Sequence, residues 1–209
     1  IYKRDNSAGG KIAEFQAYIT NRANTPTIST GFKKFDSLIG GGLESRLYVL
    51  GATTGLGKSI FAEQVADYIS GQGTPVFYFA LEMGTFELMG RSISRISFQT
   101  EKKKDMPNFN NCKTARNIAD GKNWIGYNHA ERDLMCASFE HYRLSASNLF
   151  IFDSSSSAEG NITINDIERQ IGAFTALTDR PPVVIVDYLQ LLPPENDRLT
   201  DKAATDRNI

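Results

Sequence analysis

The sequence has few of the residues that would indicate a secreted, membrane-bound or metal-rich protein. Its 209 residues include two cysteines, two histidines and one tryptophan. Such sparse cysteine gives neither a disulfide framework nor a zinc site, so we expect a reduced intracellular protein. No run reaches the ~18 apolar residues of a membrane helix, and the opening IYKRDNSAGG lacks a secretory apolar stretch. We therefore expect a cytoplasmic chain with no membrane partner.

An excess of charge of either sign is also missing. The chain has 23 Lys and Arg against 24 Asp and Glu, a formal net charge of −1. No overall field would attract a polyanion, so any such site must be local. The 41% hydrophobic content is ordinary for a globular domain, and the length suffices to bury one core.

The N-terminal residues have the pattern of an arm. Residues 11–22 place apolar side chains at helical spacing, and Pro26 then favours an extended connector. We assign residues 1–28 to a linker arm and residues 29–209 to one domain. The arm helix packs either on its own domain or on a neighbouring subunit, and the sequence leaves both open.

Short apolar runs alternate with helical patterns along the rest of the chain. Four of these runs are predicted as strands: 47–50, 76–80, 149–153 and 183–192. Thr163 is a candidate N-cap for the helix before the last strand. We predict an α/β fold with a mainly parallel sheet flanked by helices, and a ligand at the carboxyl ends of its strands.

One glycine-rich stretch, GATTGLGKSIFAEQVA at residues 51–66, indicates a phosphate site. Small residues between a strand and a helix let successive backbone N–H groups surround phosphate oxygens. Alanine stands where the pattern usually has its first glycine, at a strand-to-loop junction where a small residue suffices, and Gly51 would end the strand. The predicted loop consists of Ala52, Thr53, Thr54, Gly55, Leu56, Gly57, Lys58 and Ser59. We expect Lys58 to contact the β and γ phosphates of a nucleoside triphosphate, and Ser59 to offer its hydroxyl to Mg²⁺.

Two acidic residues at predicted strand ends complete the candidate site. Asp187 closes the run VVIVD, where a carboxylate could hold Mg²⁺ or one of its waters. Glu82 follows the strand in FYFALEM, where a carboxylate could activate a water beside the γ phosphate. The alternatives are purely structural roles: Asp187 could cap a loop, and Glu82 could be an acidic residue at the start of a helix.

Several stretches together resemble the ATPase domain of the DnaB-type replicative helicases, which are RecA-like P-loop proteins. They are STGFKKFDSLIGGGL, GATTGLGKSIFAEQVA, LEMGTFELMGRSISRIS, VVIVDYLQLL and DKAATDRNI, in that order. The resemblance implies a hexameric ring that unwinds duplex DNA with ATP and Mg²⁺. It implies catalytic roles for Lys58 and Glu82, and metal roles for Ser59 and Asp187. The implied partners are single-stranded and forked duplex DNA and identical subunits, with a primase and a helicase loader as further candidates.

The sequence departs from that family in two places. Residues 101–132 are atypical, and their EKKK run is either a solvated loop or a DNA contact. The chain stops at Ile209, before the expected later strands, DNA-binding loops and arginine finger, so we expect an incomplete ATPase domain that does not unwind DNA by itself. The alternatives are a recombinase or clock-type ATPase, which LEM and DYLQL disfavour, and a non-catalytic helicase regulator, which Glu82 disfavours.

Overall fold

The computed structural model describes residues 7–23, 25–53, 55–156 and 161–192. The chain divides into two compact units, Ile1–Val49 and Leu50–Ile209, and each is described by itself. The boundary expected at residues 28 and 29 stays a prediction. No helix in the described ranges is long and apolar enough to cross a membrane.

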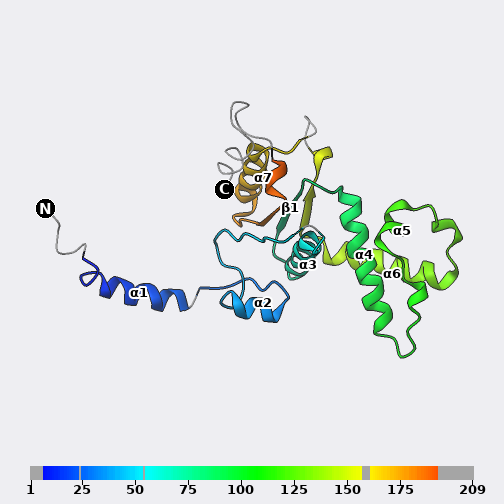
Figure 1. Ribbon diagram of the computed structural model, residues 1–209, viewed down its shortest axis with the longest axis horizontal. Helices are drawn as coiled ribbons and strands as arrows, with labels where there is room; N and C mark the ends of the chain where they lie inside the picture. The colour runs from blue at the N-terminus through cyan, green and yellow to red at the C-terminus, as the bar shows by residue number, and fades with distance from the viewer. Residues whose placement is uncertain (1–6, 24, 54, 157–160, 193–209) are drawn as a thin grey trace. The chain divides into compact units, whose positions relative to one another are not determined.

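The described part of the first unit contains α1 (Ile12–Ala23), close to the predicted residues 11–22, and a second helix, α2 (Lys33–Leu38) (Figure 1). An antiparallel bridge between Ile28 and Leu43 closes the segment around α2. The buried Asp36 carboxylate lies inside it and accepts hydrogen bonds from Thr30 N at 3.0 Å, Thr30 Oγ1 at 2.6 Å and Ser29 Oγ at 2.7 Å. Burial alone would raise the pKa of Asp36, but these hydrogen bonds outweigh it and lower the pKa.

The second unit is built on a parallel sheet of three strands in the order β2-β1-β3. The strands are β1 (Val76–Ala80), β2 (Leu149–Phe152) and β3 (Val183–Asp187). In register, Val76 pairs with Leu149 on one side and with Val183 on the other. All five residues of β1 are buried, as expected for a central strand covered on both faces.

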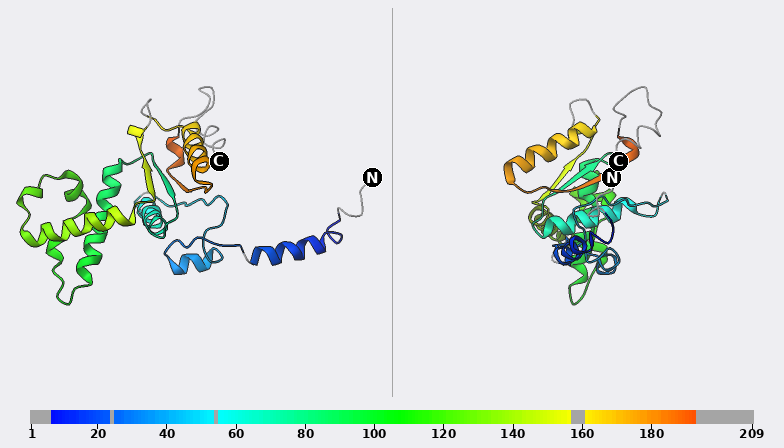
Figure 2. Two further views of the ribbon diagram at one scale, coloured as in Figure 1. Left: turned by 180° about the vertical axis from the view of Figure 1, so that it is seen from behind. Right: turned by 90° about the vertical axis from the view of Figure 1, so that its left-hand side faces the viewer.

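Helices cover the two faces of this sheet, α3 (Lys58–Gly71) on one and α7 (Ile164–Thr178) on the other (Figures 1 and 2). Alternate side chains of a strand point to opposite faces, so Phe77 and Phe79 point together toward α7. Phe77 packs on Phe174 of α7 with ring centroids 5.1 Å apart. The predicted cap of α7 is confirmed: Thr163 and Asp166 form a reciprocal capping box.

A helical lobe follows β1 in the chain. Its elements are α4 (Thr85–Lys102), η2 (Phe109–Asn111), α5 (Ala115–Asp120), η3 (Trp124–Gly126) and α6 (His129–Ser145). The buried carboxylate of Glu101 fixes the turn after α4, since it accepts the N–H of Asn108 at 2.8 Å and pairs with Lys104 at 2.6 Å. The EKKK run therefore begins on the last turn of α4 and continues into this turn.

Two strand predictions are wrong. Residues 47–50 form no strand, so Gly51 ends none, and Leu47 and Val49 are 68% and 80% exposed. A strand exists only where a neighbour completes its hydrogen bonds, and none of the described strands β2, β1 and β3 pairs with residues 47–50. The last predicted strand also ends early, because β3 stops at Asp187 and η5 (Leu189–Leu191) follows.

Although β3 is a run of apolar residues that ends in an aspartate, it is not fully buried, since half-buried and exposed residues precede the buried Asp187. In the described part of the sheet β3 has a neighbour on one side only, which explains its partial exposure.

Candidate nucleotide site

The predicted phosphate loop leads directly into α3. Gly55 and Gly57 have φ angles of +85° and +86°, in the left-handed region that favours glycine. A Cβ added at either position would meet no atom within 4 Å, so the space beside this backbone is open. Thr54 lies outside the described residues. The loop thus has the backbone freedom and the open approach that an anion needs at a helix N-terminus.

Lys58 and Ser59 are the first two residues of α3, and both are half-buried. The Lys58 Nζ lies 4.3 Å from the centre of the Tyr188 ring, in a cation–π contact. Tyr188 directly follows β3, so this contact brings the start of α3 next to the carboxyl end of that strand. The structure therefore places Lys58 beside the residue that follows Asp187.

Asp187 is 6% exposed at the end of β3. Its Oδ2 accepts a hydrogen bond of 2.9 Å from the hydroxyl of Tyr78, which is itself 1% exposed. Burial, and then the adjacent carboxylate, raise the pKa of the Tyr78 hydroxyl, so it stays protonated and donates to Asp187. A buried carboxylate held by one neutral donor retains acceptor capacity for another ligand.

Glu82 lies one residue beyond the point where the ladder between β1 and β3 ends. The N–H of Leu81 donates to the carbonyl of Asp187 at 2.9 Å, so the chain enters Glu82 directly beside Asp187. The Glu82 side chain is exposed and makes no hydrogen bond or ion pair within the described ranges. Nothing there competes for its carboxylate, as a group that must act on water requires.

The side chains also fit a magnesium ion. Mg²⁺ keeps most of its waters and needs only one or two protein oxygens. The Ser59 hydroxyl and the Asp187 carboxylate are oxygen donors of the right kind, and Asp187 Oδ1 takes part in no hydrogen bond among the described residues. No group of three or more His, Cys, Asp or Glu side chains that could hold a metal ion occurs in those residues.

Sequence reasoning missed residues that support this site. Tyr78 and Tyr188 contact Asp187 and Lys58, and the available signal for Tyr78 was a hydroxyl within an otherwise apolar strand. Asp153, which directly follows β2, has a structural role instead: its Oδ2 accepts the backbone N–H of Thr85 at 2.8 Å. The hydrogen bonds from Ser155 and Thr85 hold the pKa of Asp153 well below its ordinary value. Asp153 therefore caps α4 from a distant strand.

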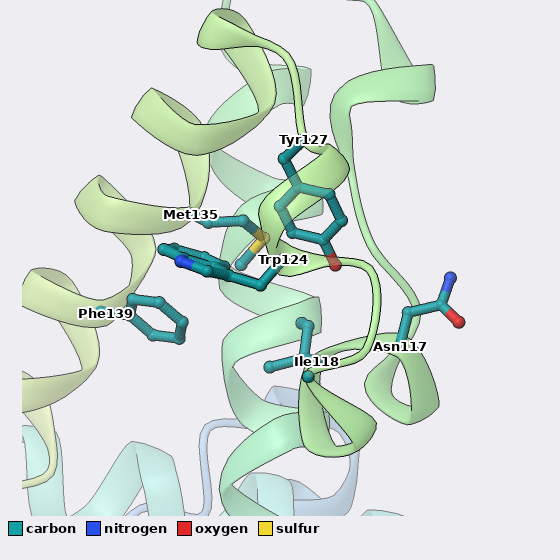
Figure 3. Close-up of a pocket in the computed structure, with 7 residues that line it drawn as sticks. Asn117, Ile118, Trp124, Tyr127, Met135 and Phe139 are labelled. Atoms are coloured by element: carbon teal, nitrogen blue, oxygen red, sulfur yellow. The ribbon is translucent and has the colours of Figure 1, made fainter.

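The two cavities of the helical lobe are weaker candidates for nucleotide binding than this site. One has a volume of about 20 Å³, room for a single water, and is lined by the labelled residues of Figure 3 such as Trp124, Tyr127 and Met135. A wider open depression of about 370 Å³ lies beside it. Its charged side chains already have partners, because Lys113 pairs with Glu131 and lies 4.9 Å from the Tyr127 ring centre, and Lys122 pairs with Asp120 at 3.2 Å.

Comparison with known proteins identifies the family of the chain. The model of the DnaB-like helicase C-terminal domain matches residues 27–208. The chain belongs to this family. The replicative DNA helicase DnaB of Treponema pallidum (strain Nichols) is 37% identical over 75 residues, which are 35% of this chain and 17% of that protein.

Solved structures with low sequence identity share the fold. The ATPase domain of G40P aligns with a TM-score of 0.70 and 21% identity, over 98% of this chain and 66% of that one. A DnaB-like replicative helicase studied for its interactions with primase aligns with a TM-score of 0.71 and 21% identity, over 99% of this chain and 45% of that one. The chain thus spans only part of the length of these DnaB-like relatives. The α/β fold predicted from the sequence is confirmed.

Proposed function

We propose that this chain is the ATP-driven motor part of a replicative DNA helicase. The observation that carries the proposal is the meeting of three predicted residues at one edge of the sheet. Asp187 ends β3, Glu82 follows β1 beside it, and Lys58 lies against Tyr188. A nucleotide at the carboxyl ends of parallel strands, in front of a helix N-terminus, would meet all three.

Each residue has a distinct role in this proposal. The backbone of residues 52–59 surrounds the phosphates, and the Lys58 ammonium neutralises charge on the β and γ phosphates. Ser59 and Asp187 hold Mg²⁺, which when bound supplies charge neutralisation between the phosphates. Glu82 accepts a proton from the attacking water.

The remaining parts of the proposal concern assembly. We infer a hexameric ring, as the resemblance to DnaB-type helicases implies, in which α1 docks on a neighbouring subunit through its apolar residues Ile12, Phe15 and Ile19. Single-stranded and forked duplex DNA would be the substrates of that ring. A primase is a candidate partner because one of the structural relatives is a helicase that interacts with primase. A helicase loader stays a further candidate.

Two substitutions, made in the full-length protein that contains this chain, test the nucleotide chemistry. Lys58→Ala removes the charge that faces the phosphates and should abolish detectable ATP binding. Glu82→Gln keeps the size of the side chain and leaves the phosphate loop unchanged, so ATP should bind as in the parent. Without the carboxylate, turnover should fall by about 10²- to 10⁴-fold. Lys34→Ala and Glu168→Gln, both at exposed helical positions, serve as matched controls.

Two results would contradict these assignments. Turnover by Glu82→Gln at the parental rate would remove Glu82 as the base. ATP binding by Lys58→Ala with parental affinity would show that the nucleotide site lies elsewhere.

A further inference from the structure

Tyr78 carries the one polar side chain of β1, in the sequence VFYFA. Its neighbours Phe77 and Phe79 point toward α7 and complete the aromatic core on that face. Tyr78 therefore points to the opposite face, the one that α3 covers. A buried tyrosine in such a place needs a partner for its hydroxyl, because an unpaired buried hydroxyl costs free energy.

The partner is the carboxylate assigned to the metal. Tyr78 pairs in register with Ile185, and Ala80 pairs with Asp187, so Tyr78 and Asp187 are diagonal neighbours on one face. The Tyr78 hydroxyl reaches Asp187 Oδ2 at 2.9 Å. It is the only side-chain donor to Asp187 among the described residues, and a single donor on one oxygen fixes the rotation of the whole carboxylate.

We propose that Tyr78 is a positioning residue that aims the second oxygen of Asp187 at the magnesium ion of the bound nucleotide. This inference rests on the proposed function, and it adds a residue that acts through Asp187 without touching the metal. Two contacts hold Asp187 close to the predicted phosphate loop. Lys58 lies over the ring of Tyr188, the residue after Asp187, and the N–H of Leu81 donates to the Asp187 carbonyl. Residues of this kind typically change metal affinity by 10- to 100-fold when they are removed.

The test is nucleotide affinity measured with and without magnesium. The substitution Tyr78→Phe, made in the full-length protein, keeps the aromatic ring and deletes the hydroxyl. Binding of a fluorescent ATP analogue should weaken about tenfold in magnesium and stay at the parental affinity in EDTA. Tyr127→Phe is the matched control, because Tyr127 is also buried but lies in the helical lobe, and it should change neither affinity.

A double-mutant cycle with Asp187→Ala distinguishes a role of Tyr78 in orienting Asp187 from a role in the stability of the fold. If Tyr78 acts through Asp187, Tyr78→Phe should have no further effect on magnesium-dependent affinity once the carboxylate is gone. Equal weakening with and without magnesium would assign the hydroxyl to the fold and overturn the proposal. So would parental affinity in magnesium, or a Tyr78→Phe chain that no longer unfolds cooperatively.

Lys58→Ala in the same assay keeps the two hypotheses distinguishable. If Lys58→Ala loses binding while Tyr78→Phe binds as the parent does, the proposed function stands and only the role of Tyr78 fails. If Lys58→Ala binds the analogue with parental affinity, the nucleotide site itself is wrong and both fail.

Discussion

Replacing Glu63 by glutamine should raise the free energy of unfolding relative to the parent, and this gain should be larger at neutral pH than at acid pH. Glu63 lies on α3, is 4% exposed, and accepts a hydrogen bond of 2.9 Å from Ser92 Oγ. Its Oε2 has no hydrogen-bond partner among the described residues. Burial is the main cause that raises the pKa of Glu63, from the ordinary 4.5 to about 7.

The groups around Glu63 act in both directions. On α3 itself, the Asp67 carboxylate adds to the rise in the pKa of Glu63. From α4, the Ser92 hydroxyl and the charges of Arg95 and Arg91 oppose that rise. Tyr78 of β1 and Tyr142 of α6 face the same carboxylate, and Glu63 contributes to raising the pKa of each hydroxyl. Burial outweighs the opposing charges.

The sign of the pH effect follows from where the proton is held. Between pH 4.5 and about pH 7 the folded chain keeps the proton of Glu63 and the unfolded chain loses it, so the free energy of unfolding falls as pH rises. Each pKa unit corresponds to about 1.4 kcal/mol, so this one group lowers the free energy of unfolding by at most about 3.5 kcal/mol across that range. Above pH 7 both states are ionised and the loss is complete.

Urea unfolding of the parent and of Glu63→Gln from pH 4 to pH 8 measures this contribution directly. The difference in unfolding free energy between the two should grow by about 3 kcal/mol in favour of the variant between the ends of the series. Glu140→Gln is the control, because Glu140 is exposed and its pKa is lowered by the hydrogen bond with Arg143. A constant difference between parent and Glu63→Gln over the whole series would refute a raised pKa for Glu63.

Three further substitutions test the fold. Thr163→Ala removes half of the capping box with Asp166 and should lower the free energy of unfolding by about 1 kcal/mol; an unchanged urea midpoint would contradict the cap. Gly42→Ala should destabilise the first unit by about 1 to 3 kcal/mol or more, because φ is +143° and the new Cβ would lie 2.6 Å from the Ile28 carbonyl oxygen. Faster amide exchange at Ile28 would report it, and parental exchange would count against it. Phe77→Ala should cost about 3 to 5 kcal/mol in urea unfolding, and a cost below about 1 kcal/mol would place Phe77 outside the core.

Local sequence patterns predicted the elements whose stability is local. The run VFYFA became β1 at the predicted residues, because five consecutive buried positions suit only a central strand. Thr163 was identifiable as a cap because a threonine with an acidic residue three positions later satisfies two backbone groups at once. The site residues Glu82 and Asp187 could be placed together for a related reason, since parallel strands end at the same edge of a sheet.

Features that depend on distant partners could not be read from the sequence. Residues 47–50 are apolar enough for a strand, but strand formation requires hydrogen bonds with a neighbouring strand, and no local pattern reveals whether they form. The hydrogen bond between Tyr78 and Asp187 joins residues 109 positions apart, and the register of β1 and β3 alone creates it. The capping of α4 by Asp153 is hidden for the same reason.

Amide hydrogen exchange with and without ATP and magnesium tests the central claim most directly. If the nucleotide binds where Lys58, Glu82 and Asp187 meet, ATP should slow exchange in the peptides that cover residues 51–62 and the ends of β1 and β3. Protection confined to the helical lobe around Lys113 and Tyr127, with residues 51–62 unchanged, would contradict the account.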